Sequence, residues 1–300
     1  MLVTMKEILD AAKAGNYCVP APNYMDELDV KSCIEAAEES EAPLILDISR
    51  MAGSPLDEFV SLLRASVERA KKTWVPVAIN LDHGGSFEHI VQAIHYGCTS
   101  VMIDRSSLPY EDNVRETAEI VRIAHACGCS VESELGHVGN NVQEGPSPEG
   151  MGEDEEVVRH GVESEEEKRK FYTNPEEAVK FVEETGVDCL AVAVGTVHGL
   201  YPEGFKPSLD FDLLKELGEK VKVPLVLHGG SGTGEELLNK ASQLGANKLN
   251  VGSDLFKAKA IGKAEAAKEG KDPTAAGQAA YKAELKEYMR FLGAKGKAKR

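Results

Sequence analysis

The chain has 300 residues, of which 42% are hydrophobic and 28% are charged, and its formal net charge is −16. This length and composition are sufficient for one large domain or two small ones. The excess of acidic residues disfavours nucleic acids and anionic membranes as partners. No apolar run approaches the roughly 20 residues of a membrane span, and the N-terminus has the pattern of an amphipathic helix rather than of a signal peptide.

The six cysteines are scattered along the chain. Cys127 and Cys129 lie closer together than the C-x-x-C spacing that is typical of zinc and redox sites. We therefore interpret them as reduced thiols of the core, and we expect a cytoplasmic protein.

Short apolar runs recur along the chain, and each ends in polar or small residues. They are nearly continuous in apolar residues, as expected of parallel strands that are covered on both faces. The expected strands are residues 17–23, 43–49, 75–83, 99–104, 129–136, 188–195, 223–230 and 247–254. Helical spacing occupies the intervals, at residues 32–40, 56–72, 86–97, 114–128, 174–186, 211–221 and 233–245.

Strands that alternate with helices over about 250 residues indicate an α/β fold, a (β/α)8 TIM barrel. We expect one domain over residues 1–300. The alternative is an open doubly wound sheet, although no G-x-G-x-x-G follows the first strand, which weakens the dinucleotide-binding version.

Two segments depart from this alternation. Residues 137–172 form a long acidic loop, either a solvated excursion with a short charged helix or a lid over the active-site face. Residues 256–300 form a helical C-terminal extension, and we expect its end, residues 293–300, to be frayed.

Three of the histidines stand at strand ends and precede a glycine. They are His83 in LDHG, His198 in GTVHG and His228 in LHGG. The carboxyl ends of barrel strands converge on one mouth, so these imidazoles are expected to meet there. Three neutral imidazoles with an open fourth position are typical of a catalytic zinc site, although a single strand-end histidine is more often structural.

Three acidic side chains accompany these histidines. Asp82 lies directly before His83, and the turn into Gly84 can bring both side chains to the mouth. A carboxylate beside a metal is suited to proton transfer, but Asp82 could equally cap a helix or orient a ligand. Ser86 is the better helix cap. Asp104 and Glu134 also end strands, where they could reach the metal, form its outer shell or only hydrogen-bond at the rim.

Glycine-rich turns follow the last two expected strands. HGGSGTG covers residues 228–234, and NVGSD covers residues 250–254. Backbone N–H groups at a helix N-terminus can cradle a phosphate, and barrels frequently bind phosphate after strands seven and eight.

Taken together, LDHG, SVMID, VESELG, GTVHGLY, PLVLHGGSGT and KLNVGSD resemble the motifs of a known family. This is the class II, zinc-dependent ketose-bisphosphate aldolases, which act on fructose or tagatose 1,6-bisphosphate. The resemblance spans residues 1–260. It implies reversible retro-aldol cleavage of a ketose phosphate to dihydroxyacetone phosphate and an aldehyde, with zinc stabilising the enediolate.

The resemblance also implies roles for single residues. His83, His198 and His228 would bind Zn²⁺, and Glu134 and Asp104 would lie at an alternate or second metal position. Asp82 would move the C4 hydroxyl proton. The substrate and its phosphate would contact Asn23, Ser49, Gly199, Gly229, Gly230, Ser231, Asn250, Val251, Gly252 and Ser253. A monovalent cation (Na⁺ or K⁺) near the phosphate and a homodimer or homotetramer are further implications.

The chain departs from the family pattern in the loop that should supply a C3 proton carrier. A glycine is replaced by Asn140 there, and Glu144 is the candidate for the displaced acid.

The other departures concern substrate recognition. Gly252 stands where aspartate is common in fructose-type and alanine in tagatose-type members, and Phe256 replaces an arginine. Pro202 replaces a lysine, for which Lys206 could compensate, and Arg105 replaces a glycine and could supply a charge. We therefore expect retained chemistry with an altered aldehyde, one that lacks the second phosphate.

Other functions remain open from the sequence. A different zinc barrel enzyme, such as a hydrolase or epimerase, would not need the phosphate cradle. A non-catalytic companion subunit should lack the LDHG and HGGSG sets, both of which are present. None of the expected strands ends on lysine, which disfavours a Schiff-base mechanism.

Overall fold

The computed structural model describes residues 1–49, 55–138, 169–199, 201 and 207–298. These residues contain eight parallel strands in one sheet, whose order is β1-β8-β7-β6-β5-β4-β3-β2. The strands are β1 (Val19–Pro22), β2 (Leu44–Ile48), β3 (Val77–Gly84), β4 (Ser100–Ile103), β5 (Ser130–Leu135), β6 (Cys189–Val192), β7 (Leu225–Leu227) and β8 (Ala246–Val251). A parallel bridge between Asn23 and Asp47 joins the two outer strands, so the sheet closes into a barrel. The TIM-barrel prediction is confirmed, and the open sheet is not what forms.

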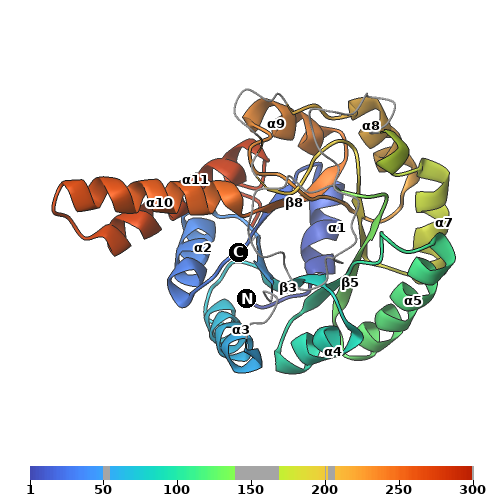
Figure 1. Ribbon diagram of the computed structural model, residues 1–300, viewed down its shortest axis with the longest axis horizontal. Coiled ribbons are helices and arrows are strands. Elements are labelled where there is room, and N and C mark those ends of the chain that lie inside the picture. Colours follow the sequence, from blue (N-terminus) through green and yellow to red (C-terminus); the bar gives the residue numbers. More distant parts are fainter. Residues whose placement is uncertain (50–54, 139–168, 200, 202–206, 299–300) are drawn as a thin grey trace.

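Helices surround the barrel as an outer ring (Figure 1). In the described residues they are α2 (Glu27–Ser40), α3 (Leu56–Ala70), α4 (Phe87–Tyr96), α5 (Tyr110–Ala126), α7 (Pro175–Thr185), α8 (Phe211–Lys220), α9 (Glu235–Gln243), α10 (Ser253–Lys268) and α11 (Pro273–Phe291), with a 3₁₀ turn η1 (Arg169–Phe171). Helices α2 and α5 begin earlier than expected. Asp26 caps α2 by accepting from two N–H groups, and the acidic Glu111 and Asp112 lie in the first turn of α5, where they interact favourably with the helix N-terminus. Polar first turns are thus stabilised without an apolar stripe.

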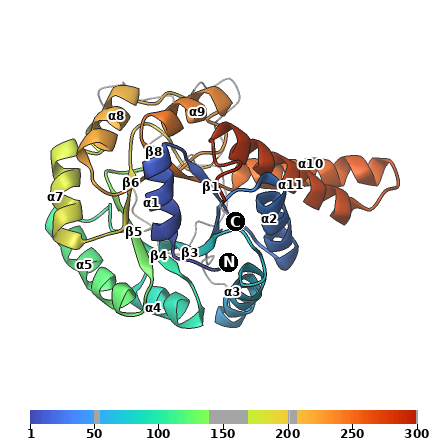
Figure 2. The same ribbon diagram turned by 180° about the vertical axis from the view of Figure 1, so that it is seen from behind.

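The N-terminal helix α1 (Met5–Gly15) lies across the barrel, as the view from behind shows (Figure 2). Thr4 caps it through a capping box with Glu7, and Met5 and Leu9 are completely buried. The N–H of Lys6 donates to Ser130 Oγ at the first residue of β5 (3.4 Å). Helix α1 therefore covers the amino ends of the strands, which leaves the carboxyl ends as the open mouth.

The C-terminal helices α10 and α11 form an antiparallel hairpin that extends beyond the ring (Figure 1). Tyr281 of α11 is completely buried and donates from its hydroxyl to the Asn23 carbonyl oxygen (2.7 Å). The expected helical extension is confirmed. The expected fraying is wrong for residues 293–298, because the N–H groups of Gly296 and Ala298 donate to the carbonyls of Ser40 and Glu41.

The cysteines are free thiols, and all of them lie in the described ranges. Five are buried, as expected of core thiols, namely Cys18, Cys33, Cys98, Cys129 and Cys189. Cys127 is exposed, because it follows the last turn of α5 at the surface.

Most of the acidic loop, residues 139–168, lies outside the described residues, so the choice between a lid and a solvated excursion stays open. No helix in the described ranges combines the length and the apolar composition that crossing a membrane would require.

Candidate active site

Three histidines from different strand ends meet at the mouth of the barrel. Nε2 of His83 lies 3.1 Å from Nδ1 of His228, and Nε2 of His198 lies 3.4 Å from the same atom. Within the described part of the chain, this is the group of ligand-type side chains whose donor atoms are close enough to hold one metal ion. Nε2 of His228 faces a carboxylate oxygen of Glu132, so its Nδ1 carries the lone pair that faces the other two rings and could bind a cation placed among them.

The backbone at the end of β3 explains how adjacent residues reach the same mouth. His83 has φ +48°, and the β3–β4 register shifts between Leu81 and Gly84, so β3 carries one extra residue. A Cβ on Gly84 would lie 2.4 Å from the Met102 carbonyl oxygen, so only glycine fits there. The bulge breaks the strand alternation, and both Asp82 and His83 turn into the site.

The outward nitrogens of two of these histidines are held by carboxylates. Nδ1 of His83 lies 3.1 Å from Asp104 Oδ2, and Nε2 of His228 lies 2.8 Å from Glu132 Oε1. Asp104 is itself fixed by Ser106, whose N–H and hydroxyl both donate to it. A carboxylate behind a metal-binding histidine sets its tautomer and ring orientation. This arrangement fits a metal held by the other nitrogen of each ring.

The histidine pKa values follow from burial and neighbouring charge. Burial favours neutral His83, but Asp82 and Asp104 outweigh burial and raise its pKa to about 10. Burial lowers the pKa of His198 and His228, and the positive charge of His83 lowers both further. The site thus holds two imidazoles neutral, and its acidic side chains stabilise positive charge at the third.

Asp82 lies beside the cluster and is held by donors on three strands or strand ends. Its Oδ1 accepts from Asn250 Nδ2 (3.0 Å), and its Oδ2 accepts from Asn23 Nδ2 (2.8 Å) and Ser49 Oγ (3.2 Å). Burial opposes ionisation, but the charges of His83 and Lys248 and the hydrogen bond from Asn23 outweigh it and hold the pKa of Asp82 well below its usual range. Ser86, and not Asp82, caps α4 by accepting from His89 N–H.

Glu134 lies deeper in the same region. Its Oε2 is 3.8 Å from Nδ1 of His228, and its Oε1 accepts from Val138 N–H (3.2 Å). Burial raises its pKa well above the usual range, with the charge of Asp104 adding to the effect. Asp104 and Glu134 therefore both lie next to the histidines, and whether either binds a metal directly stays a prediction.

The glycine-rich turns after β7 and β8 form one wall of the site. Gly229 has φ +66°, and a Cβ there would lie 2.2 Å from the Val197 carbonyl oxygen, next to His198. The Gly230 N–H donates to the Asn250 carbonyl (3.2 Å), which joins the two turns.

Helix α10 begins at Ser253, directly after Val251 and Gly252, and Gly252 supplies no side-chain cap. Ser231 Oγ accepts from the Asp254 N–H (3.2 Å). The positive end of α10 thus faces these turns, as a phosphate cradle requires.

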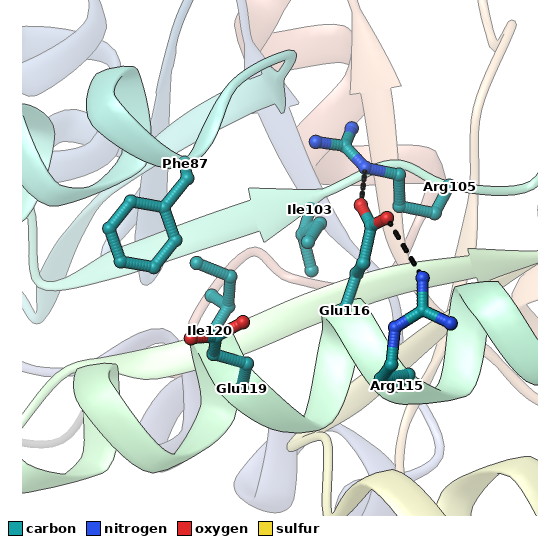
Figure 3. Close-up of a pocket in the computed structure, with 7 residues that line it drawn as sticks. All are labelled: Phe87, Ile103, Arg105, Arg115, Glu116, Glu119 and Ile120. Carbon is teal, nitrogen blue, oxygen red and sulfur yellow. Dashed lines mark hydrogen bonds and ion pairs between the residues drawn. The ribbon is translucent and has the colours of Figure 1, made fainter.

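Arg105 does not extend over the mouth. Its Nε donates to Glu116 (2.6 Å), and its terminal nitrogens donate to the Asp104 and Gly85 carbonyls (2.7 and 3.1 Å). Figure 3 shows it above Glu116 in a pocket between α4 and α5, with Arg115 on the other side of that carboxylate. Arg105 was expected to supply a positive charge for the substrate, but its guanidinium binds Glu116 instead.

Phe256 is partly buried, and its ring centroid lies 6.0 Å from that of Tyr281. It packs between α10 and α11. Gly199 has φ +86° and lies at the edge of the described residues. Asn140, Glu144, Pro202 and Lys206 lie outside the described residues.

Sequence reasoning missed Glu132 and Lys248. Both are completely buried charges within strands, and they pair at 2.9 Å. The signal was present in SVESEL and NKLNV, because a charge that interrupts a buried strand requires a partner. The identity of that partner could not be read from one strand alone.

Comparisons with known proteins agree with this geometry. The family model described as fructose-bisphosphate aldolase class-II matches residues 3–297. The chain belongs to the class II fructose-bisphosphate aldolase family. It is an aldehyde-lyase of this metal-dependent class, and its histidine cluster is able to hold the metal. The resemblance seen in the motifs is confirmed.

Similar proteins cover nearly the whole chain. A probable fructose-bisphosphate aldolase of Bacillus subtilis is 42% identical, covering 89% of this chain and 87% of that protein. The fructose-bisphosphate aldolase of Geobacillus stearothermophilus is 39% identical over 99% of both chains. Among solved structures, the YdjI aldolase of Escherichia coli K12 superimposes with a TM-score of 0.82 at 30% identity over 100% of both chains.

Proposed function

We propose that this class II aldolase is zinc-dependent and cleaves a ketose phosphate to dihydroxyacetone phosphate and an aldehyde. The observation that carries the proposal is the convergence of three imidazole nitrogens beside an ionised carboxylate. Asp82 Oδ1 lies 3.8 Å from Nε2 of His83, the nitrogen that faces the other two histidines. A carbonyl bound at the cluster would therefore place its neighbouring hydroxyl groups near Asp82.

The donor set favours zinc over harder cations. Imidazole nitrogens suit Zn²⁺, whereas Mg²⁺ and Ca²⁺ prefer oxygen ligands. His83, His198 and His228 would hold the ion, with Asp104 and Glu132 orienting two of the rings from behind. When bound, zinc would supply a Lewis acid that polarises the substrate carbonyl. Glu134 and Asp104 remain proposed ligands of an alternate or second metal position.

Asp82 would accept the C4 hydroxyl proton during cleavage and return it during condensation. Its low pKa keeps it ionised, and Asn23, Ser49 and Asn250 hold both oxygens in place. Orientation by fixed donors places the carboxylate before the substrate arrives, so little reorganisation is needed. For the proton at C3, Glu144 remains the proposed carrier.

The phosphate of the dihydroxyacetone half would lie against Gly229, Gly230, Ser231 and the α10 N-terminus from Val251 to Ser253. Gly199 would line the same pocket. The proposal also includes a Na⁺ or K⁺ ion beside the phosphate and a homodimer or homotetramer. It further includes a cytoplasmic location and a single domain over residues 1–300.

For the aldehyde half, we propose a group without a second phosphate. Phe256 is apolar and packs against Tyr281, and the guanidinium of Arg105 is held by Glu116. Neither of these side chains is then available to neutralise a distal phosphate, and a phosphate dianion binds poorly in a partly buried site unless a cation pairs with it.

A cleavage panel tests the proposal. Zinc-loaded protein is incubated with fructose 1,6-bisphosphate, tagatose 1,6-bisphosphate and ketose 1-phosphates with neutral, deoxy or oxidised distal ends. Dihydroxyacetone phosphate release is followed with and without a chelator. We expect chelator-sensitive release, with a higher kcat/KM for a monophosphate. Equal efficiency on all substrates would contradict the altered aldehyde, and no release from any would contradict the aldolase chemistry.

A further inference from the structure

Lys248 of β8 is a completely buried cation in the interior of the barrel. Its Nζ donates to Asn250 Oδ1 (2.6 Å) and forms ion pairs with Glu132 (2.9 Å) and Asp47 (3.1 Å). The ammonium group thus has one hydrogen-bond acceptor and two carboxylate counterions around it. A cation so far from water persists only where its partners replace the lost hydration.

Two of these partners each contact the candidate site directly. Glu132 uses one carboxylate oxygen for Lys248 and the other for Nε2 of His228 (2.8 Å). Asn250 uses its carbonyl oxygen for Lys248 and its amide nitrogen for Asp82 (3.0 Å). Lys248 is thus one side chain removed from a histidine of the cluster and from the adjacent carboxylate.

Lysine also determines which way these partners point. An ammonium group can only donate, so the Asn250 oxygen must face Lys248 and its nitrogen must face Asp82. The reversed amide would place its oxygen against the Asp82 carboxylate, where it could only repel. In the same way, the charge of Lys248 keeps Glu132 ionised and fixed, as an acceptor behind His228 must be.

The third partner anchors Lys248 to β2, which is separated from β8 by the single strand β1. Asp47 lies on β2, is completely buried and accepts from Asn80 Nδ2 of β3 (3.0 Å). Strands β8 and β2 are not hydrogen-bonded neighbours in the sheet. The ion pair therefore bridges two strands past the intervening β1 and fixes the position of the Lys248 ammonium group.

We propose that Lys248 is a positioning residue that holds His228 and Asp82 in register with one another. It links the side chain that would bind the metal to the side chain that would carry the proton, without touching the substrate. The inference rests on the function proposed above for those two residues. Its consequence is that loss of Lys248 weakens metal binding and slows turnover together.

A structural role alone makes a different prediction. If Lys248 only neutralises buried carboxylates, then Lys248→Met should destabilise the fold, and adding Asp47→Asn should restore the protein by removing an uncompensated charge. The double variant still lacks the links to Glu132 and Asn250. Lys259→Met is a matched control, because Lys259 is another mostly buried lysine that pairs with Asp29 (2.5 Å) and Asp26 (3.1 Å) outside the site.

The experiment compares wild type, Lys248→Met, Lys248→Met with Asp47→Asn, and Lys259→Met. Thermal unfolding reports stability. Zinc affinity is measured on the metal-free proteins against a competing chromogenic chelator, and kcat and KM are measured on the ketose phosphate that wild type cleaves best. We expect both Lys248 variants to bind zinc about 10–100-fold more weakly and to lose kcat by a similar factor, with KM little changed. Lys259→Met should lose stability but keep zinc affinity and kcat.

Wild-type zinc affinity and kcat in either folded Lys248 variant would overturn the inference. So would recovery of both quantities in the double variant, since charge balance would then be sufficient. The zinc titration does not depend on turnover. If wild-type protein binds zinc but cleaves nothing, the proposed function fails while the link through Glu132 to His228 is still tested.

Discussion

A left-handed residue at a strand end places two adjacent side chains in one site. His83 adopts φ +48°, a conformation that costs about 1–3 kcal/mol for a residue other than glycine. The bulge beside Gly84 and the contacts of Asp82 and His83 hold this conformation. Strain of this kind is stored where geometry matters more than stability, and here it brings the carboxylate beside the imidazole.

Asp82→Asn tests the role of that carboxylate. Asparagine keeps the size and two hydrogen-bonding groups but cannot accept a proton at neutral pH. We expect the rate of cleavage to fall by about 10²–10⁴-fold, the usual contribution of a general base, while zinc affinity is retained. Asp188→Asn is the control, because Asp188 is a buried carboxylate that contacts Val131 N–H at the start of β5, far from the mouth. Unchanged turnover in Asp82→Asn would exclude proton transfer by Asp82.

Much of the site at this scale could be predicted from sequence. The three histidines and Asp82 were identifiable because each lies at the end of an apolar strand or, for His198, in the turn that follows one, and parallel strands bring such ends together. The direction of Arg105 could not be predicted, because it depends on Glu116 of α5, which is close only in the folded chain. Asn23 and Ser49 were expected to line the substrate pocket. The structure places their donors on Asp82, which no local pattern indicated.

At the scale of elements, the backbone of the turn between β7 and α9 lies directly against the backbone of the turn after β6. A side chain at Gly229 would meet the Val197 carbonyl, and Val197 directly precedes His198. The turn after β6 therefore packs on the turn after β7, and both carry a histidine of the cluster.

The variants Gly229→Ala and Gly128→Ala distinguish the cost of a strained backbone conformation from the cost of steric overlap with a neighbour. Both glycines have positive φ, +66° and +75°, but a methyl group added to Gly128 would meet no neighbouring atom within 4 Å. We expect Gly128→Ala to lower the free energy of unfolding by about 1–2 kcal/mol. Gly229→Ala should lose about 1–3 kcal/mol more through overpacking and should also weaken zinc binding. Equal losses in a denaturant titration would show that the contact with Val197 is unimportant.

The expected element boundaries agree with the structure where an apolar stripe marks them, and they differ from it where no such stripe is present. Helices α3, α4, α7 and α8 begin within one residue of their expected starts, because an apolar face or a capping residue opens each one. The first turns of α2 and α5 are polar and were missed. The charges inside β5 and β8 belong to a network that spans the barrel, so neither strand alone identifies its partner.

For the whole molecule, closure of the sheet determines which side chains of different strands can contact one another. Because β1 and β2 meet at the Asn23–Asp47 bridge, the interior is a closed space that every strand faces. Lys248, Asp47 and Glu132 can then pair across it, which an open sheet would not allow. Helix α1 covers the amino ends, so the site has one open side.

Metal binding should stabilise this molecule measurably. Zinc that binds only the folded chain adds about 2.7 kcal/mol to the free energy of unfolding when free zinc is 100 times Kd. We expect thermal unfolding of metal-free protein to shift upward on adding zinc and to return on chelation. His228→Ala is the comparison, since it removes the central member of the cluster. A zinc-induced shift in that variant as large as in wild type would place the metal elsewhere.

The most direct measurement is a zinc titration of metal-free protein in which dihydroxyacetone phosphate release is followed in the same samples. The geometry of the three-histidine cluster predicts no release without metal, a rise with each addition, and saturation at one zinc ion per chain. Release that persists under full chelation, or zinc bound at His83, His198 and His228 without cleavage of any ketose phosphate, would contradict it.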